Sequence, residues 1–176
     1  RSAQVARIGL PAWKGLYSVV SIVGLALIVW GYGMARTAPI EVWNPPVFTR
    51  HLASLFTLAA FVLLVAAYVP RNRIKAAIGH PMVAGVKLWA FAHLLANGTV
   101  ADLLLFGSFL VWAIFDFRAA RRRDRAAAAG ATRGGASAGA SPSLAADVVV
   151  VLVGIGAWAL FAFQLHGWLF GVRPFG

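Results

Sequence analysis

The chain alternates between long apolar runs and short segments that hold most of its charges and prolines. Four apolar runs are long enough to cross a membrane, and they cover residues 16–35, 49–69, 99–117 and 144–172, while a shorter run covers 81–97. A helix needs about 20 apolar residues to span the hydrocarbon core of a bilayer. The pattern therefore predicts an all-α fold, a polytopic transmembrane helical bundle with five spans in this chain.

The shortest run has clear boundaries. Pro81 suits the first position of a helix, where a missing N–H costs nothing. Gly98 suits the residue just past a helix end, and the pair Asn97-Gly98 predicts a tight turn into the next span. At about 1.5 Å per residue the run is roughly 25 Å long, barely enough for a membrane span.

The composition changes after residue 117, and the chain divides accordingly. Residues 1–117 hold four spans and a basic lead-in, whereas 118–143 combine a run of arginines with an Ala/Gly/Ser stretch. Such a stretch has too little apolar variety to form a packed core, so we expect 118–143 to be a disordered loop. Residues 144–176 hold the last span and a tail.

Hydrophobic residues make up 61% of the 176 positions, and the mean hydropathy is +0.80. Soluble domains have roughly 45–50% apolar residues, so the protein is expected to lie in a lipid bilayer. The net charge of +11 comes from basic residues beside the spans. Nucleic-acid binding would need a solvated basic face with stacking aromatics, so we expect no nucleic-acid partner.

Alternating spans place 1–15, 70–80 and 118–143 on one side of the membrane. These segments hold twelve of the 16 Lys and Arg residues. Because positive residues are enriched on the cytoplasmic side, we expect these basic segments to be cytoplasmic.

Four histidines are the main candidates for chemistry. Topology places His51, His93 and His166 in the non-cytoplasmic leaflet, within roughly 3–10 Å of one interface, and His80 on the opposite side. Helical bundles build cofactor sites in this way, from side chains on facing helices. The alternative is that each histidine is a hydrogen-bonding group between helices.

The residues near the histidines limit which metal or cofactor these side chains could bind. A zinc site is disfavoured, because no two histidines lie at i, i+3 or i+4 and the chain has no cysteine. Haem needs only one or two axial imidazoles and a wide apolar slot. Small residues could open that slot or serve close helix packing; they are Gly154, Gly156, Ala157, Ala159 and Ala162.

Three further polar or aromatic residues lie near these histidines. Trp89 and Asn97 share one helix face with His93, because they recur at i, i+4 and i+8. Asp102 lies in the first turn of the following span, where it either caps the helix or orients an imidazole.

Several segments of this sequence are similar to the NnrU family of bacterial membrane proteins. The resemblance rests on residues 13–17, 50–52, 65–70, 80–82, 87–98, 105–109 and 166–171. The family usually has an aspartate after the glycine of the 93–98 motif, where this chain has Thr99. It also usually begins with a further apolar helix that bears a histidine, so the resemblance implies a sixth span in the full protein.

The resemblance implies a protein of the bacterial inner (plasma) membrane, linked to nitrite and nitric oxide reduction. A relative of the family is the plastid cis-zeta-carotene isomerase, in which two histidines ligate haem b. By position, His51 and His166 would be the iron ligands here and His93 a third candidate, supported by Trp89, Asn97 and Asp102.

Two functions are therefore compatible with the sequence. One is a haem b-binding membrane protein that carries out redox chemistry or the isomerisation of a carotenoid-like lipid. The other is a non-enzymatic accessory subunit of a larger respiratory or photosynthetic complex.

Overall fold

The computed structural model describes residues 2–131 and 141–175, and these form helices joined by turns and short irregular segments, with an isolated antiparallel bridge between Glu41 and Thr99. Four helical stretches are long and apolar enough to cross a membrane, and a fifth apolar helix is shorter, so the predicted all-α polytopic bundle is confirmed. The elements are α1 (Ser2–Ile8), α2 (Leu10–Ala35), α3 (Val47–Tyr68), α4 (Arg73–Ile78), α5 (Pro81–Ala96), α6 (Val100–Ala131), α7 (Leu144–Leu160), the π-helix η1 (Phe161–Leu165) and α8 (His166–Phe170).

The chain divides into two units, of which Arg1–Ile40 is the first. It consists of α1 and α2, joined at Gly9, whose φ of 79° favours glycine. Helix α2 begins at Leu10, earlier than the expected residue 16, because Pro11 is tolerated in a first helical turn. It has no buried residue and is predominantly apolar, as expected for a helix that is long enough to cross a membrane.

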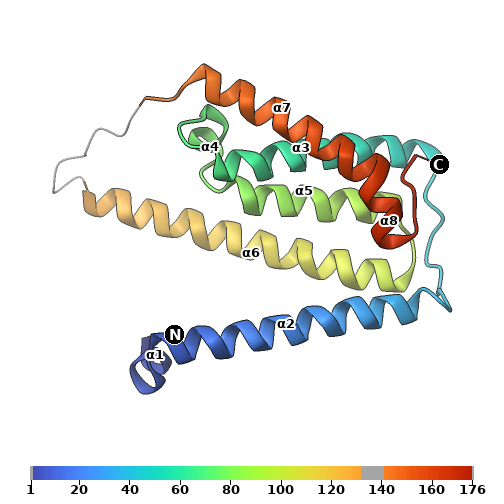
Figure 1. The fold of residues 1–176 in the computed structure, drawn as a ribbon, viewed down its shortest axis with the longest axis horizontal. Helices are drawn as coiled ribbons and strands as arrows, with labels where there is room; N and C mark the ends of the chain where they lie inside the picture. Colours follow the sequence, from blue (N-terminus) through green and yellow to red (C-terminus); the bar gives the residue numbers. More distant parts are fainter. Residues whose placement is uncertain (1, 132–140, 176) are drawn as a thin grey trace. The chain divides into compact units, whose positions relative to one another are not determined.

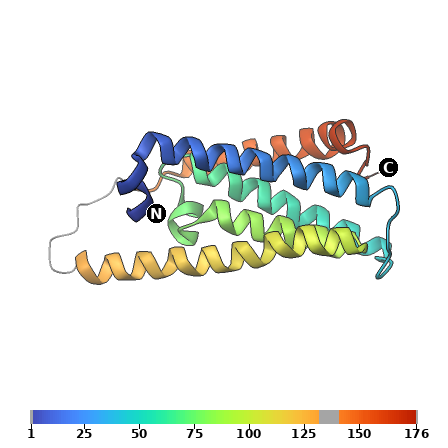
Figure 2. The same cartoon turned by 90° about the horizontal axis from the view of Figure 1, so that it is seen from below.

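The second unit, Glu41–Gly176, contains the remaining helices. Helix α3 packs against both α5 and α7, and α5 packs in turn against α6. These four helices run lengthwise beside one another in the order α7, α3, α5, α6 (Figures 1 and 2). The central position of α3 makes its two contact faces the core of this unit.

Small residues let α3 approach its neighbours closely. A Cβ added to Gly154 of α7 would lie 2.8 Å from the Val62 Cα, and one added to Gly85 of α5 would lie 3.0 Å from the Ala60 carbonyl oxygen. The buried apolar residues of these helices are also mostly alanines, among them Ala60, Ala66 and Ala90. Such small residues are typical of interfaces between membrane helices, where backbones pack tightly.

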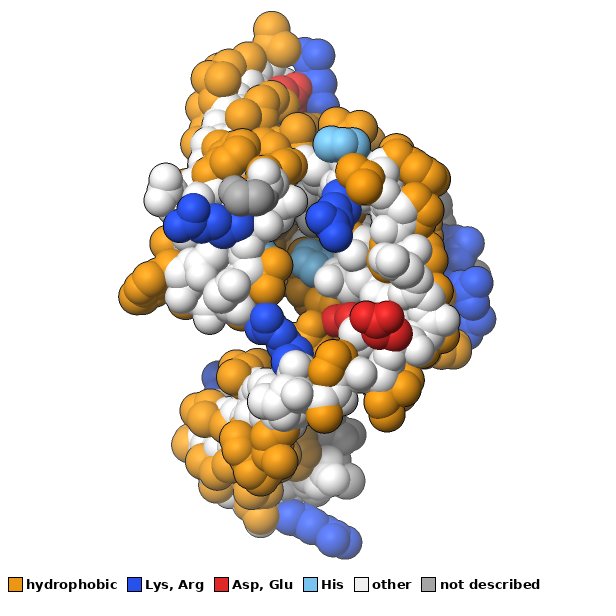
Figure 3. Space-filling model, turned by 90° about the vertical axis from the view of Figure 1, so that its right-hand side faces the viewer, with side chains coloured by type: hydrophobic (Ala, Val, Ile, Leu, Met, Phe, Trp, Pro, Cys, Tyr) orange, Lys and Arg blue, Asp and Glu red, His pale blue; other side chains and the backbone are white. Residues whose placement is uncertain are grey.

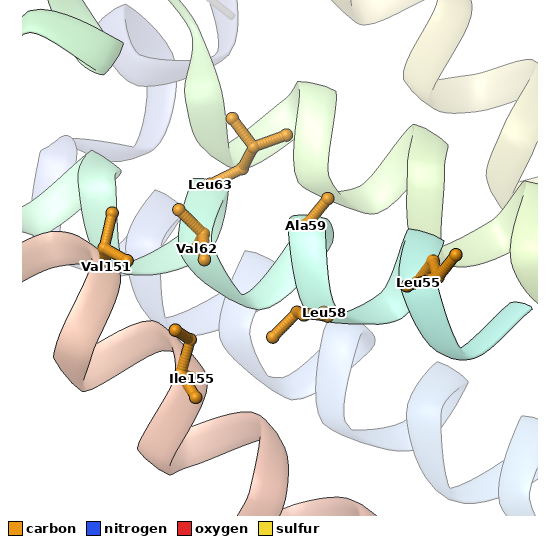
Figure 4. A pocket seen from close by; sticks show the side chains of 7 residues that line it. All are labelled: Leu55, Leu58, Ala59, Val62, Leu63, Val151 and Ile155. Atoms are coloured by element: carbon orange, nitrogen blue, oxygen red, sulfur yellow. The ribbon is translucent and has the colours of Figure 1, made fainter.

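The outer side of the α3–α7 contact is an open apolar groove of about 420 Å³ (Figure 4). Its lining is Leu55, Leu58, Ala59, Val62, Leu63, Val151 and Ile155. Of the small residues considered for a haem slot, Gly154 is instead buried against Val62. Gly154 therefore allows close packing of α7 against α3.

The predicted loop at 118–143 begins later than expected. Helix α6 continues without a break through the arginine run to Ala131, so the expected boundary at residue 118 is wrong. Alanine and arginine both have high helix propensity, which explains why the helix persists beyond its apolar part. The rest of the predicted loop lies largely at 132–140, outside the described residues.

Buried polar contacts fix the end of the unit at which α4 lies. The Asn72 side chain donates to the carbonyls of Ala66 (2.9 Å) and Val69 (2.6 Å) and accepts from the Lys75 N–H (2.6 Å). The Asp147 carboxylate of α7 accepts from the Arg73 N–H at 2.6 Å. These bonds satisfy backbone groups that would otherwise lack partners at the start of α4 and the end of α3.

We predict that Gly154→Ala destabilises the protein by about 1–3 kcal/mol, because its methyl group would overlap the α3 backbone. Gly156→Ala is a matched control on the same helix, since a Cβ there meets nothing within 4 Å. Unfolding in mixed micelles, followed by circular dichroism, measures both. Equal stability of the two variants would contradict the close α3–α7 packing.

Candidate functional site

His93 lies in the last turn of α5, with its imidazole held on two sides. Its Nδ1 donates to the Trp89 carbonyl oxygen at 2.9 Å. Because a carbonyl can only accept, Nδ1 carries the proton and the Nε2 lone pair is left for another partner. The ring stacks on Phe106 of α6, with centroids 4.5 Å apart and planes at 29°, and lies 4.9 Å from the Trp89 ring.

The turn between α5 and α6 brings Phe106 level with His93, and Gly98 makes that turn possible. The N–H groups of Val42 and Trp43 both donate to the Gly98 carbonyl, at 2.8 and 3.2 Å. A Cβ on residue 98 would overlap the Trp43 carbonyl oxygen. The glycine of the His93–Gly98 motif is thus required by the close approach of another backbone segment.

The residues expected to support His93 have separate roles. The Asn97 side chain donates to the His93 main-chain carbonyl at 2.8 Å, so it caps the end of α5. Asp102 is buried and accepts from the Thr99 hydroxyl at 2.6 Å and the Thr99 N–H at 3.1 Å, while Thr99 Oγ1 accepts from the Asp102 N–H at 3.2 Å. This reciprocal pair is a capping box at the start of α6.

His166 begins α8, directly after the π-helix η1. Its N–H donates to the Phe161 carbonyl five residues earlier, and its ring makes edge contacts with Phe161 and Phe170. Its Nδ1 donates to the Val172 carbonyl at 2.7 Å, so here too the Nε2 lone pair is available. Single π-helical turns occur frequently at functional sites.

The carbonyl that holds His166 belongs to a tail that folds back after α8. Gly171 adopts the left-handed conformation (φ 70°) that ends the helix. Beyond it, Phe175 stacks on Phe163 with centroids 4.9 Å apart and makes an edge contact with Trp158. Residues 172–175 therefore hold the His166 side chain through the Val172 carbonyl, and we call these residues the clasp.

The two anchored histidines lie at the same end of the second unit. His93 lies in the last turn of α5, and α8, which begins with His166, lies at that same end of the unit in Figure 1. Figure 3 views this end, where α3 and α6 begin and α5 ends, and shows one histidine at the surface and another recessed in a hollow between basic, hydrophobic and backbone atoms.

The other two histidines are placed differently. His51 is exposed in the second turn of α3. His80 precedes α5 at the opposite end, where its Nε2 lies 2.8 Å from an Asp124 oxygen. Within residues 2–131 and 141–175, no three His, Cys, Asp or Glu side chains form a group that could hold a metal ion. A preformed zinc site of three ligands is therefore not seen in this part of the chain.

Sequence reasoning missed Phe106 and the Val172 carbonyl. The tight turn at Gly98 could have indicated Phe106, because in an antiparallel helix pair residues at similar distances from the turn lie level. The Val172 contact had no such signal, since it depends on η1 and on the left-handed Gly171.

We predict that Gly98→Ala breaks the contact between residues 41–43 and the α5–α6 turn. The amide hydrogens of Val42 and Trp43 should exchange faster, because their shared acceptor is displaced. Gly107→Ala in α6 is the control, since a Cβ there meets nothing within 4 Å. Unchanged exchange in Gly98→Ala, measured by mass spectrometry, would rule out the contact.

We predict that Phe175→Ala opens the clasp and reduces the population of His166 with a protonated Nδ1. Aromatic pairs contribute about 0.5–1.5 kcal/mol, so the equilibrium constant between the closed and the open tail should fall by roughly two- to twelvefold. Nitrogen-15 spectra of histidine-labelled protein measure the tautomer. Trp168→Ala, at a position 81% exposed, should leave it unchanged; an unaltered tautomer in Phe175→Ala argues against the clasp.

Comparison with known proteins identifies the family. No curated protein and no solved structure matches the chain. The family model described as NnrU protein matches residues 1–174, which covers the anchored histidines, the turn at Gly98 and most of the tail. The chain therefore belongs to the NnrU family of membrane proteins.

Proposed function

We propose that this protein binds haem b at the end of the bundle where His93 and His166 lie, with the two imidazoles as axial ligands. The observation that carries the proposal is the matching state of these side chains: each donates Nδ1–H to a main-chain carbonyl and keeps Nε2 free. Metal-bound histidines in proteins are held in this way, because the bond to Nδ1 fixes both tautomer and ring orientation.

The surroundings of the two histidines suit an apolar macrocycle. Phe106 and Trp89 cover His93, and Phe161 and Phe170 lie against His166. Haem iron takes one or two axial imidazoles in an apolar pocket, so the donor set and the aromatic lining both fit this group.

Each residue has a defined task in this proposal. Haem, when bound, would supply one-electron chemistry or polarise a bound lipid substrate. The carbonyls of Trp89 and Val172 orient the imidazoles, and the four aromatic rings pack against them.

His51 remains a candidate ligand in place of His93. It lies near the start of α3, at the same end of the unit, but its side chain is exposed. The pair His51 and His166 would need α3 and α8 on opposite sides of one porphyrin. The half-buried position of His93 and the hydrogen bond at its Nδ1 favour the pair that includes His93.

For cellular context we propose the bacterial inner membrane, with the basic end of the bundle in the cytoplasm. The basic residues of α4 and of the end of α6 support this orientation. The chemistry would then be redox reactions linked to nitrite or nitric oxide reduction, or isomerisation of a carotenoid-like lipid, at the opposite leaflet.

The test is an absorption spectrum of detergent-purified protein from haem-sufficient cells. We predict a low-spin haem b spectrum for the wild type. His93→Ala and His166→Ala should each give five-coordinate, high-spin iron, and the double variant should lose haem. His80→Ala is the control, because His80 pairs with Asp124 at the other end.

The remaining outcomes separate the alternatives. A spin-state change in His51→Ala but not in His93→Ala would identify His51 and His166 as the ligands. A colourless wild-type protein that co-purifies stoichiometrically with other subunits would overturn the haem proposal and support the accessory-subunit function.

A further inference from the structure

The arginine run at the end of α6 forms one face of a continuous helix. Helix α6 has 32 residues and is therefore about 48 Å long, well beyond the roughly 30 Å hydrocarbon core of a membrane. Its apolar part ends at Phe117, and the arginines begin at the next residue. This extension therefore starts where the headgroup layer starts.

The arginines are not spread evenly around the helix. At about 100° per residue, four of them lie within an arc of about 100°, and Arg123 lies about 150° from the centre of that arc. All five side chains are exposed. We call the four that share the arc the arginine face; they are Arg118, Arg121, Arg122 and Arg125.

Three of these four arginines have no carboxylate of α6 beside them. Asp124 lies on the side of the helix that packs against the bundle, where its oxygen is 2.8 Å from His80 Nε2 and also lies beside Gly79, near the Arg121 guanidinium. Asp116 lies almost opposite the arginine face by the same helical count. The charges of Arg118, Arg122 and Arg125 are therefore left for an external anion.

Contacts with the bundle fix the direction of the extension. The His80–Asp124 pair joins α6 to the start of α5. Gly79, with a φ of 79°, leaves room for the Arg121 guanidinium, whose nitrogen would lie 3.2 Å from a Cβ at that position. The arginine face thus has a set position beside the apolar part of α6.

We propose that the arginine face binds the phosphate groups of anionic phospholipids. Arg118 and Arg125 are about 10 Å apart along the helix axis, whereas the headgroup layer is roughly 5–8 Å thick on each side, so most of the face lies within it. Basic clusters directly beside a membrane span attract anionic lipids. Arginine suits phosphate because its planar guanidinium makes two parallel hydrogen bonds.

The experiment uses the whole purified protein in detergent, where membrane orientation plays no part. Equal amounts of phosphatidylglycerol and phosphatidylcholine are added, and the lipids that co-elute in gel filtration are quantified by mass spectrometry. The wild type should retain more phosphatidylglycerol, and this preference should fall as sodium chloride rises.

Two neighbouring substitutions distinguish lipid binding by the arginine face from an effect of the net charge alone. Arg122→Gln should lower the preference roughly fivefold, the effect of about 1 kcal/mol per basic residue, whereas Arg123→Gln removes the same charge and should leave it unchanged. Equal effects of the two variants, no preference in the wild type, or a salt-independent preference would each overturn the proposal. The salt series needs only the wild type, so it decides the matter even if a variant does not fold.

Discussion

The close approach of α3 to its two neighbours is the constraint on which the second unit depends. Lipid tails are as apolar as leucine, so membrane helices gain little from hydrophobic burial against each other and depend on tight packing. That packing is concentrated at Gly85, which lies against Ala60, and at Gly154, which lies against Val62. Through these contacts α3 positions both α5 and α7, the helices that lead to His93 and His166.

The ends of the helices are held by a different kind of interaction. Backbone groups at a helix end need partners, and side chains supply them here. Thr99 and Asp102 cap α6, and Asn72 and Asp147 cap α4. Threonine caps helices well, which suits Thr99 to its place at the start of α6.

The sequence was sufficient to predict the fold class and most helix positions. Proline and glycine bounded α5, and the observed helix Pro81–Ala96 agrees with the expected 81–97. The end of α6 was not predicted, because a low-complexity segment of alanine and arginine has the composition of a loop but also high helix propensity. Local composition cannot decide between these two outcomes.

The sequence predicts how far along its helix each histidine lies. It does not predict which way each side chain points around the helix axis. Counting residues from the interface places His51, His93 and His166 in one leaflet, yet it says nothing about which side chains face each other. The π-helix before His166 shifts the register of everything that follows, and the regular 3.6-residue period gives no sign of it. For this reason the hydrogen bonds that anchor Nδ1 of His93 and of His166 could not be predicted from the sequence.

The proposed role of His93 and His166 as a pair of haem ligands can be tested by pulsed electron paramagnetic resonance of the oxidised protein, labelled with nitrogen-15 histidine. If both imidazoles bind the iron, the wild type gives low-spin ferric haem with couplings to two axial imidazole nitrogens, one of which disappears in His93→Ala. Two axial couplings that persist in His93→Ala, or a protein with no ferric haem signal, would show that these two residues are not the ligand pair.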